Sequence, residues 1–168
     1  LYNDTKLSDN SVIPIHPTPV IGMVGLIENI NKVCKKSWLK SGDHIWMIGL
    51  NLETNNNKDD RISLAASSFL EYIHDLKTGR PPVIDLYLEK QVHLFLRKII
   101  KKGFINSAHD LGDGGLAVAM AECCISSGLG ANVVLPNSQA RLDRLLFAEG
   151  GARVLVSCSE DQSLELEK

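Results

Sequence analysis

One stretch of the chain holds the residues best placed to do chemistry, and it reads INSAHDLGDGGLAVAMAE from residue 105 to residue 122. In it His109, Asp110 and Asp113 stand just before Gly114 and Gly115, and an apolar segment follows. A helix that begins at such a glycine pair offers free backbone N–H groups and the positive end of its dipole, which favour an anion. Glycine also allows a phosphate to approach the backbone closely. The stretch is therefore a candidate phosphate-binding loop.

The same residues also fit a purely structural turn, and the sequence leaves both interpretations open. Asp113 can cap the following helix, Asp110 can fold its carboxylate back on the turn, and His109 can hydrogen-bond locally at a strand end. The spacing matches neither the G-x-G-x-x-G motif nor the G-x-x-x-x-G-K-[ST] loop. Two acidic side chains would repel a bare phosphate unless Mg²⁺ bridged them.

A second glycine pair, Gly150 and Gly151, follows Glu149 at another element boundary. Its pattern favours the end of a helix followed by a strand. The other chemically capable side chains are scattered, and no G-x-S-x-G or comparable nucleophile setting occurs. The remaining histidines show no ligand or triad spacing, and we expect them to be structural or on the surface: His16, His44, His74 and His93.

The composition is that of a globular protein, with 168 residues, 44% apolar and 23% charged residues and a net charge of −2. This charge implies no polyanionic partner. Four basic residues gather where a helix should end and complement its dipole, so we expect no nucleic-acid contact: Arg97, Lys98, Lys101 and Lys102.

The sequence shows no membrane span and no secretory signal pattern, so we expect a cytoplasmic protein without membrane contact. Its cysteines lack C-x-x-C spacing, and two of them are neighbours that point about 100° apart on a helix. We therefore expect buried, reduced thiols at Cys34, Cys123, Cys124 and Cys158.

Apolar periodicity and turn residues predict the helices and strands that must position this loop. Helices are expected from Ser63 until Gly79, from an Asp85 cap to Gly103, after Gly115 and over 141–147. The helix after Gly115 is apolar all round, which favours burial on most faces. Strands are expected over 20–27, 42–50, 104–109, 131–135 and 152–158. The alternation predicts a sheet with helices packed against it.

Four stretches, in this order and spacing, are similar to the formylglycinamidine ribonucleotide synthase family of purine biosynthesis, in its synthetase subunit or domain. They read YNDT, PTPVIGMVGLI, SAHDLGDGGLAVAMAE and LLFAEGGARVLVS. The resemblance implies a fragment in which residues 1–30 are the terminal strand segment of a preceding α+β synthetase domain. Residues 31–168 would then form an α+β unit, an α/β sandwich whose mixed sheet is flanked by helices. It would resemble the C-terminal domain of aminoimidazole ribonucleotide synthetase, without its closing strands.

The resemblance also implies an activity for the parent protein, an ATP-dependent C–N ligase. ATP would phosphorylate the amide oxygen of formylglycinamide ribonucleotide, ammonia would add, and phosphate would leave to give the amidine. A glutaminase subunit or domain would supply the ammonia, and the rest of the synthetase chain would be the other partner. ATP and Mg²⁺ would be bound mostly outside this fragment.

The family resemblance places the catalytic histidine, the ATP-contacting lysine and most Mg²⁺ ligands upstream of Tyr2 and Asn3. A Glu-Ser-Gln substrate loop of the related first half corresponds to Glu149, but Gly150 and Gly151 replace its Ser and Gln. We therefore expect no catalytic residue and no metal site here, and an inactive isolated fragment. Its candidates for contact with a ligand or phosphate are His109, Asp110, Asp113, Gly114, Gly115 and Glu149.

Two alternatives accompany this hypothesis. The domain could be a non-catalytic, pseudo-symmetric scaffold that braces the active half and holds a structural nucleotide. The chain could also come from another superfamily enzyme, such as aminoimidazole ribonucleotide synthetase, selenophosphate synthetase or a thiamine-phosphate kinase. The pairing of PTPVIGMVGLI with HDLGDGG tells against this second alternative.

Overall fold

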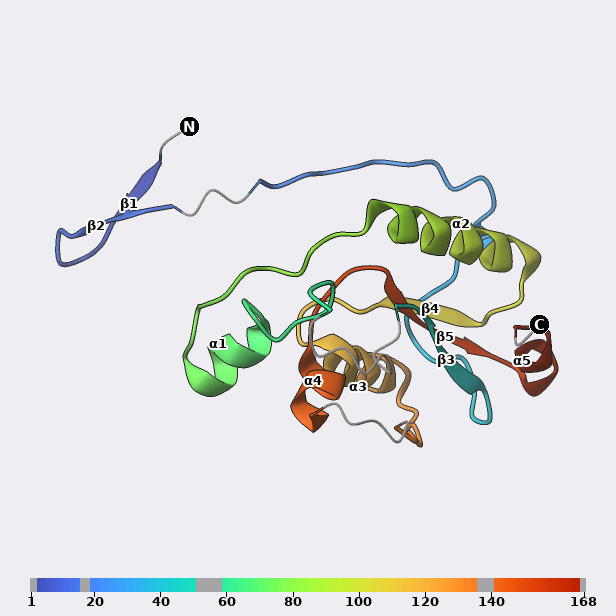
Figure 1. Cartoon of the computed structure of the whole chain (residues 1–168). Coiled ribbons are helices and arrows are strands. Elements are labelled where there is room, and N and C mark those ends of the chain that lie inside the picture. The colour runs from blue at the N-terminus through green and yellow to red at the C-terminus, as the bar shows by residue number, and fades with distance from the viewer. Residues whose placement is uncertain (1–2, 16–18, 51–58, 136–140, 167–168) are drawn as a thin grey trace.

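The computed structural model describes residues 3–15, 19–50, 59–135 and 141–166. A small antiparallel hairpin of β1 (Asp4–Lys6) and β2 (Val12–Pro14) stands apart from the body and is joined to it by an extended segment (Figure 1). A short 3₁₀ helix, η1 (Ile30–Lys32), follows that segment. Tyr2, His16 and most of the Asn-rich loop lie outside the described residues.

The body is built on a three-stranded sheet in the order β3-β5-β4. Its strands are β3 (His44–Gly49), β4 (Ser107–Asp110) and β5 (Arg153–Cys158). β5 runs antiparallel to both neighbours and is buried at every position. All described strand pairs are thus antiparallel, and the one parallel contact is an isolated bridge between Lys35 and Ser107 beside β4, so the mixed sheet implied by the family resemblance is not formed by these strands.

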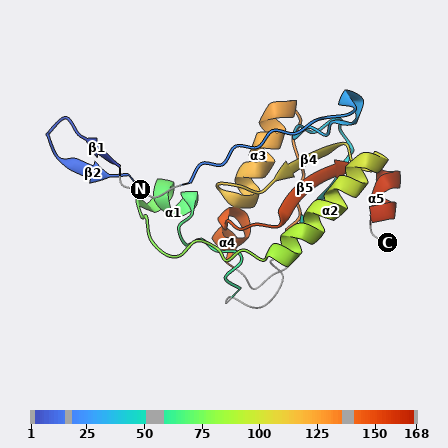
Figure 2. The same ribbon diagram turned by 90° about the horizontal axis from the view of Figure 1, so that it is seen from above.

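Two long helices cover opposite faces of this sheet (Figure 2). α2 (Leu86–Lys102) packs Val92 and Ile99 against Val154, Val156 and Cys158 of β5. α3 (Gly115–Ser127) packs on the other face, in the cluster Trp38, Leu111, Ala119, Cys123 and Leu155. The arrangement of helix, sheet and helix confirms the predicted α/β sandwich.

The local signals at helix ends account for α2. The Asp85 side chain accepts the N–H of Leu88 at 3.0 Å, and Gly103 ends the helix in the left-handed conformation at φ 70°. Lys101 and Lys102 lie in its last turn, where they complement the dipole.

The other helices are short. α1 (Ser68–His74) begins at a Ser67 cap and ends at left-handed Asp75, so it covers only part of the predicted span. α4 (Leu142–Phe147) lies within the predicted 141–147 segment. α5 (Glu160–Leu166) follows β5 and was not expected from the sequence.

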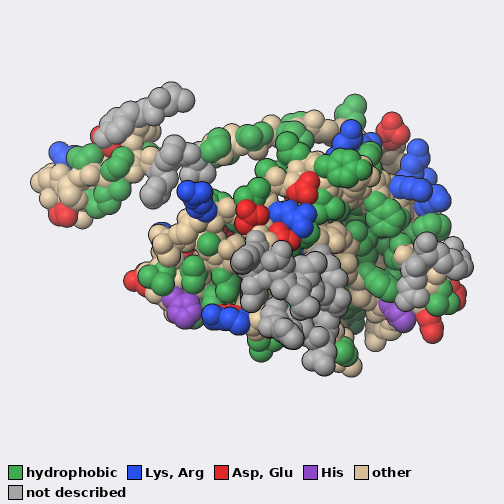
Figure 3. All heavy atoms as spheres, in the orientation of Figure 1, with side chains coloured by type: hydrophobic (Ala, Val, Ile, Leu, Met, Phe, Trp, Pro, Cys, Tyr) green, Lys and Arg blue, Asp and Glu red, His purple; other side chains and the backbone are tan. Residues whose placement is uncertain are grey.

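Two predicted strands are wrong for the described structure. Residues 20–27 form no strand, and Val20, Val24 and Leu26 are almost fully exposed along the extended segment (Figure 3). Residues 131–135 also form no strand, and Val134 is 90% exposed. Both segments carry strand-forming residues, but neither has a hydrogen-bonded partner strand among the described residues, and an isolated strand cannot satisfy its backbone.

Two further expectations need correction. α3 buries one face only, because Val118 is 39% and Ile125 82% exposed while Ala119 and Cys123 are buried. The strand expected over 104–109 begins only at Ser107. The residues before it end α2, because the backbone N–H groups of Gly103 and Phe104 bond carbonyl oxygens in the last turn of that helix.

The four cysteines are all free thiols in the structure. Cys123 and Cys158 are buried as expected, whereas Cys34 and Cys124 are only partly buried. Burial raises the pKa of Cys34 and Cys158 and raises that of Cys123 to about 11, which favours the protonated thiol at these three positions at neutral pH. Among the described helices, none combines the length and the apolar character needed to cross a membrane.

Candidate functional site

The glycine pair of the candidate loop lies where α3 begins and α4 ends. Gly115 has a φ of +64°, and a Cβ built on it would stand 2.6 Å from the carbonyl oxygen of Ala148. A side chain at this position would therefore collide with the last turn of α4. The glycine is required for close packing between two helix ends, whether or not a ligand approaches.

Glu149 supplies the anion at the start of α3. Its Oε1 accepts the backbone N–H of Gly114, the N-cap residue of α3, at 2.8 Å. The same oxygen accepts the N–H of Ser68, the first residue of α1, also at 2.8 Å. Two backbone hydrogen bonds of 2.9 Å to Ser63 hold Glu149 in place. One carboxylate thus joins the starts of two helices.

A buried guanidinium lies beside this carboxylate. Arg153 is only 2% exposed, and its Nη2 donates to the carbonyl oxygen of Ala148 at 2.7 Å. Nε and Nη1 are buried and make no hydrogen bond among the described residues. Burial lowers the pKa of Arg153 to about 10, and the nearby charge of Glu149 acts in the opposite direction.

His109 and Asp110 form a separate polar cluster with Glu122 of α3. His109 Nε2 lies 2.6 Å from a Glu122 carboxylate oxygen, and its Nδ1 lies 3.3 Å from Asp110 Oδ1. Lys36 Nζ is 3.7 Å from the same Glu122 oxygen. The hydrogen bond from His109, followed by the charge of Lys36, lowers the pKa of Glu122. Glu122 was not among the residues expected from the sequence to contact a ligand, although it is the last residue of the stretch 105–122.

The structure places five of the six candidate residues in two separate groups. One group is Gly114, Gly115 and Glu149, which meet where α3 begins and α4 ends, a place called the junction below. The other is His109 and Asp110, which lie together on β4. Asp113 belongs to neither group, because it is exposed and the N-cap of α3 is Gly114. The expected Asp113 cap is therefore wrong, since the carboxylate of Glu149 takes that role. Asp110 Oδ1 meets His109, while its Oδ2 lies near Gly112 of the turn without a hydrogen bond to the turn among the described residues.

A set of ion pairs fixes the loop that precedes α1. Arg61 bonds Asp59 at 2.8 Å and Asp85 at 3.1 Å, which ties the loop to the start of α2. Arg144 of α4 donates to the carbonyl oxygens of Asp59 and Ile62. These contacts hold Ser63, and through it the backbone of Glu149, at the junction.

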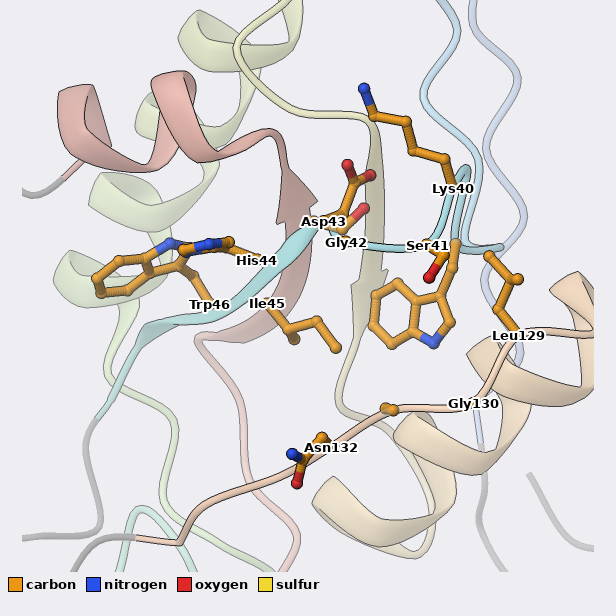
Figure 4. Close-up of a pocket in the computed structure, with 13 residues that line it drawn as sticks. Lys40, Ser41, Gly42, Asp43, His44, Ile45, Trp46, Leu129, Gly130 and Asn132 are labelled. Atoms are coloured by element: carbon orange, nitrogen blue, oxygen red, sulfur yellow. The ribbon is translucent and has the colours of Figure 1, made fainter.

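A pocket of about 700 Å³ lies at the other end of the sheet. Figure 4 shows β3 residues and Lys40 on one side and Leu129, Gly130 and Asn132 on the other. It adjoins the His44 end of β3, while the junction adjoins the Gly49 end, paired with Arg153. None of the six candidate residues lines it. Among the described residues, no three His, Cys, Asp or Glu side chains gather as metal ligands would.

A family described as AIR synthase related protein, C-terminal domain, matches residues 40–168. The chain belongs to this family. The match covers the sheet, α1 to α5 and the Glu149 junction of this AIR synthase-related domain, and it leaves out the hairpin and the extended segment.

Curated relatives are similar over the whole chain. Phosphoribosylformylglycinamidine synthase subunit PurL of Prochlorococcus marinus strain NATL1A is 80% identical over all 168 residues, which make up 21% of that protein. The subunit of strain MIT 9313 is 59% identical, again over the whole chain and 21% of the relative. The chain therefore spans about a fifth of the length of these relatives.

Solved structures confirm the fold of this AIR synthase-related domain. Phosphoribosylformylglycinamidine synthase II from Thermotoga maritima superimposes with a TM-score of 0.59 at 20% identity, over 82% of this chain and 21% of that one. The T. maritima PurL complexed with FGAR gives a TM-score of 0.60 at 19% identity, over 82% and 23% of the two chains.

Proposed function

We propose that this chain is one domain, with an attached segment, of an ATP-dependent ligase that forms formylglycinamidine ribonucleotide in purine biosynthesis. The observation that carries the proposal is the 80% identity to a phosphoribosylformylglycinamidine synthase subunit over every residue of the chain. The sandwich fold shared with T. maritima proteins of that name supports it. As in those relatives, most of the enzyme would lie outside this chain.

The reaction proposed for the whole enzyme converts an amide to an amidine. The amide oxygen of formylglycinamide ribonucleotide takes the γ-phosphoryl group of ATP, ammonia adds to the activated carbon, and phosphate leaves. ATP and Mg²⁺ are the cofactors, and a cytoplasmic glutaminase partner supplies ammonia from glutamine. T. maritima PurL complexed with ATP and with ADP, and a PurLQS structure from the same organism, support nucleotide use and assembly with partners.

We propose that the described residues take no catalytic part in that reaction. No group of carboxylates is arranged to hold Mg²⁺ within 3–15, 19–50, 59–135 and 141–166. The Gly114 N–H, which a phosphate would need at the start of α3, already binds Glu149. We therefore propose that this domain positions the catalytic part of the enzyme and is inactive alone.

We also propose two parts within the chain. Residues 1–30 would belong to the sheet of a preceding domain, and residues 31–168 would form the AIR synthase-related domain. The exposed Val20, Val24 and Leu26 support this division, because such an apolar run is stable in water only when other strands cover it.

The six candidate residues remain a proposed contact region for a ligand or for a neighbouring domain. Asp110 would face the partner, since its side chain is 85% exposed, whereas His109, whose side chain is 13% exposed, would hold the Asp110 carboxylate in place. Asp113 is exposed beside them, and Gly114, Gly115 and Glu149 would set the shape of the loop.

The test uses the longer protein that contains this chain and the isolated 168-residue chain. With ATP, Mg²⁺, ammonia and formylglycinamide ribonucleotide, the longer protein should release phosphate and form the amidine, and the isolated chain should form none. Absence of amidine with the longer protein would contradict the ligase proposal. Turnover by the isolated chain would contradict only the proposed inactivity.

A non-catalytic scaffold that holds a structural nucleotide is the second candidate, and in it Mg²⁺ would bridge the nucleotide phosphates to the exposed Asp110 carboxylate. Calorimetric titration of the chain with Mg-ADP separates it from a scaffold without ligand. Heat release with protection of the Gly114 amide would support the nucleotide-binding scaffold, and no heat would exclude it.

A further inference from the structure

The start of α3 has the features of an anion site, but it is already satisfied from within the chain. We propose that the Glu149 carboxylate occupies the position that a phosphate-type oxyanion would take, so that the intact domain binds no phosphate there. The ligand class excluded is the tetrahedral oxyanion, as inorganic phosphate or a phosphomonoester. Removing the carboxylate should open a phosphate site at this position.

The hydrogen-bond geometry is the first observation behind this proposal. Two backbone N–H groups, from Ser68 and Gly114, converge on a single Glu149 oxygen at 2.8 Å each. They come from segments far apart in the sequence, so they were brought together by the fold and not by a local turn. Converging N–H groups at a helix start are a common way in which proteins bind phosphate oxygens.

The second observation is independent and comes from Arg153. Its guanidinium is 98% buried, yet Nε and Nη1 make no hydrogen bond among the described residues. Its Nη2 binds the Ala148 carbonyl, the same oxygen that nearly touches Gly115, so the guanidinium stands beside the first turn of α3. A buried cation requires a nearby anion, and the negative charge of Glu149 acts on the Arg153 guanidinium without a direct ion pair between them.

The rest of the loop explains why one anion suffices. Asp113, which precedes Gly114 in the sequence, is exposed and adds negative charge near the start of α3. A second anion next to Glu149 would meet repulsion from both carboxylates. A phosphate that replaced Glu149 would keep both N–H donors and could also satisfy the free nitrogens of Arg153, since it offers more acceptor oxygens than a carboxylate.

The experiment compares the wild-type chain with Glu149→Ala in phosphate and in sodium chloride of equal ionic strength. The ¹H–¹⁵N signals of Ser68 and Gly114 and the thermal midpoint are measured. In the wild type, neither the two amide signals nor the thermal midpoint should respond specifically to phosphate. In Glu149→Ala the midpoint should be lower in chloride, phosphate should raise it, and both amide signals should shift with saturation. Exchange of the Gly114 amide should accelerate at least about tenfold in chloride and slow again in phosphate.

Two further variants make the result specific. Glu149→Ala combined with Arg153→Met should lose the saturable shift, because the guanidinium no longer compensates the phosphate. Glu160→Ala removes an exposed carboxylate from the first turn of α5 and should respond to phosphate as the wild type does. A phosphate shift in Glu149→Ala that is absent from the double variant would support the role assigned to Arg153.

The outcomes are decisive in each case. A saturable phosphate shift at Gly114 in the wild type would overturn the proposal, and so would a folded Glu149→Ala that responds equally to phosphate and chloride. If Glu149→Ala folds only in phosphate, the proposal is supported. If it folds in neither salt, Glu149→Ser, whose short side chain also frees the two N–H groups, takes its place, and the absence of any phosphate response in that variant would overturn the proposal. None of these results depends on ligase activity.

Discussion

Ser107 and Ser157 face each other across β4 and β5, and both are completely buried. Their hydroxyl oxygens are 2.6 Å apart, so each hydroxyl has its partner inside the sheet. A buried hydroxyl without a partner costs more than the hydrogen bond itself contributes. The pair should therefore be strongly coupled.

Ser157→Ala or Ser107→Ala alone should lower the free energy of unfolding by about 1–3 kcal/mol, because each leaves one buried hydroxyl unsatisfied. The double variant should cost less than the sum of the two single changes. Urea unfolding of the four proteins checks this, and additive losses would contradict the coupling.

Glu122 should make the stability depend on acid pH. Its pKa is lowered from the ordinary value of 4.5 in the folded chain, mainly by the hydrogen bond from His109. Stability from this group is therefore complete above pH 4.5 and is lost as the pH falls through the lower folded pKa. Glu122→Gln should flatten the loss of stability on acidification, measured by unfolding from pH 6 down to pH 3.

Lys36 gives the matched comparison for that prediction. The charge of Lys36 lowers the pKa of Glu122 less than the His109 hydrogen bond does. Lys36→Met should therefore flatten the loss of stability at acid pH less than His109→Gln does. A larger effect of the lysine would mean that its charge dominates at this partly exposed carboxylate.

At the same scale, the residue types of the site could be read from the sequence but their partners could not. Glu149 bonds residues 35 and 81 positions away, and His109 meets Glu122 at 13 positions. No local motif encodes such distances. An aspartate before a glycine pair is an ordinary cap signal, so Asp113 was expected to cap α3, yet a distant carboxylate fills that role.

At the scale of single elements, α2 depends on its cap. Asp85 accepts the Leu88 N–H, which is the main cause of its lowered pKa, and it also bonds Arg61. Asp85→Ala should lower the free energy of unfolding by about 1 kcal/mol, and Asp85→Asn should cost less because an amide oxygen can still cap the helix. Chemical denaturation checks both, and equal losses would show that the Arg61 contact matters more than the cap.

Helix ends were predictable because their causes are local. Asp85 and Gly103 act within a few residues of themselves, and the structure confirms both. Strands are different, since a run such as 20–27 or 131–135 needs a partner that the local sequence does not specify. The correct strands are those that meet β5, whose alternate residues face α2 and α3.

Across the whole molecule, apolar residues stabilise the chain only in the body and not in the extended segment. Ile99→Ala in α2 removes a side chain that is 2% exposed and should cost about 2–5 kcal/mol. Ile21→Ala removes one that is 82% exposed and should change stability by less than about 0.5 kcal/mol. Thermal and urea unfolding of the 168-residue chain check the pair, and a large loss from Ile21→Ala would show that the segment packs on the body.

The position of β5 also has a consequence for how the molecule acquires its fold. Its two ladder partners lie well before it in the sequence, and His44 pairs with Cys158 across more than a hundred residues. Ribosomal synthesis must therefore deliver β3, α2, β4 and α3 while the strand that joins them is still missing. Until then the apolar faces of α2 and α3 have no sheet to cover, and a high contact order of this kind slows folding. Chaperone binding to nascent chains should accordingly peak before residue 153 emerges and decline afterwards.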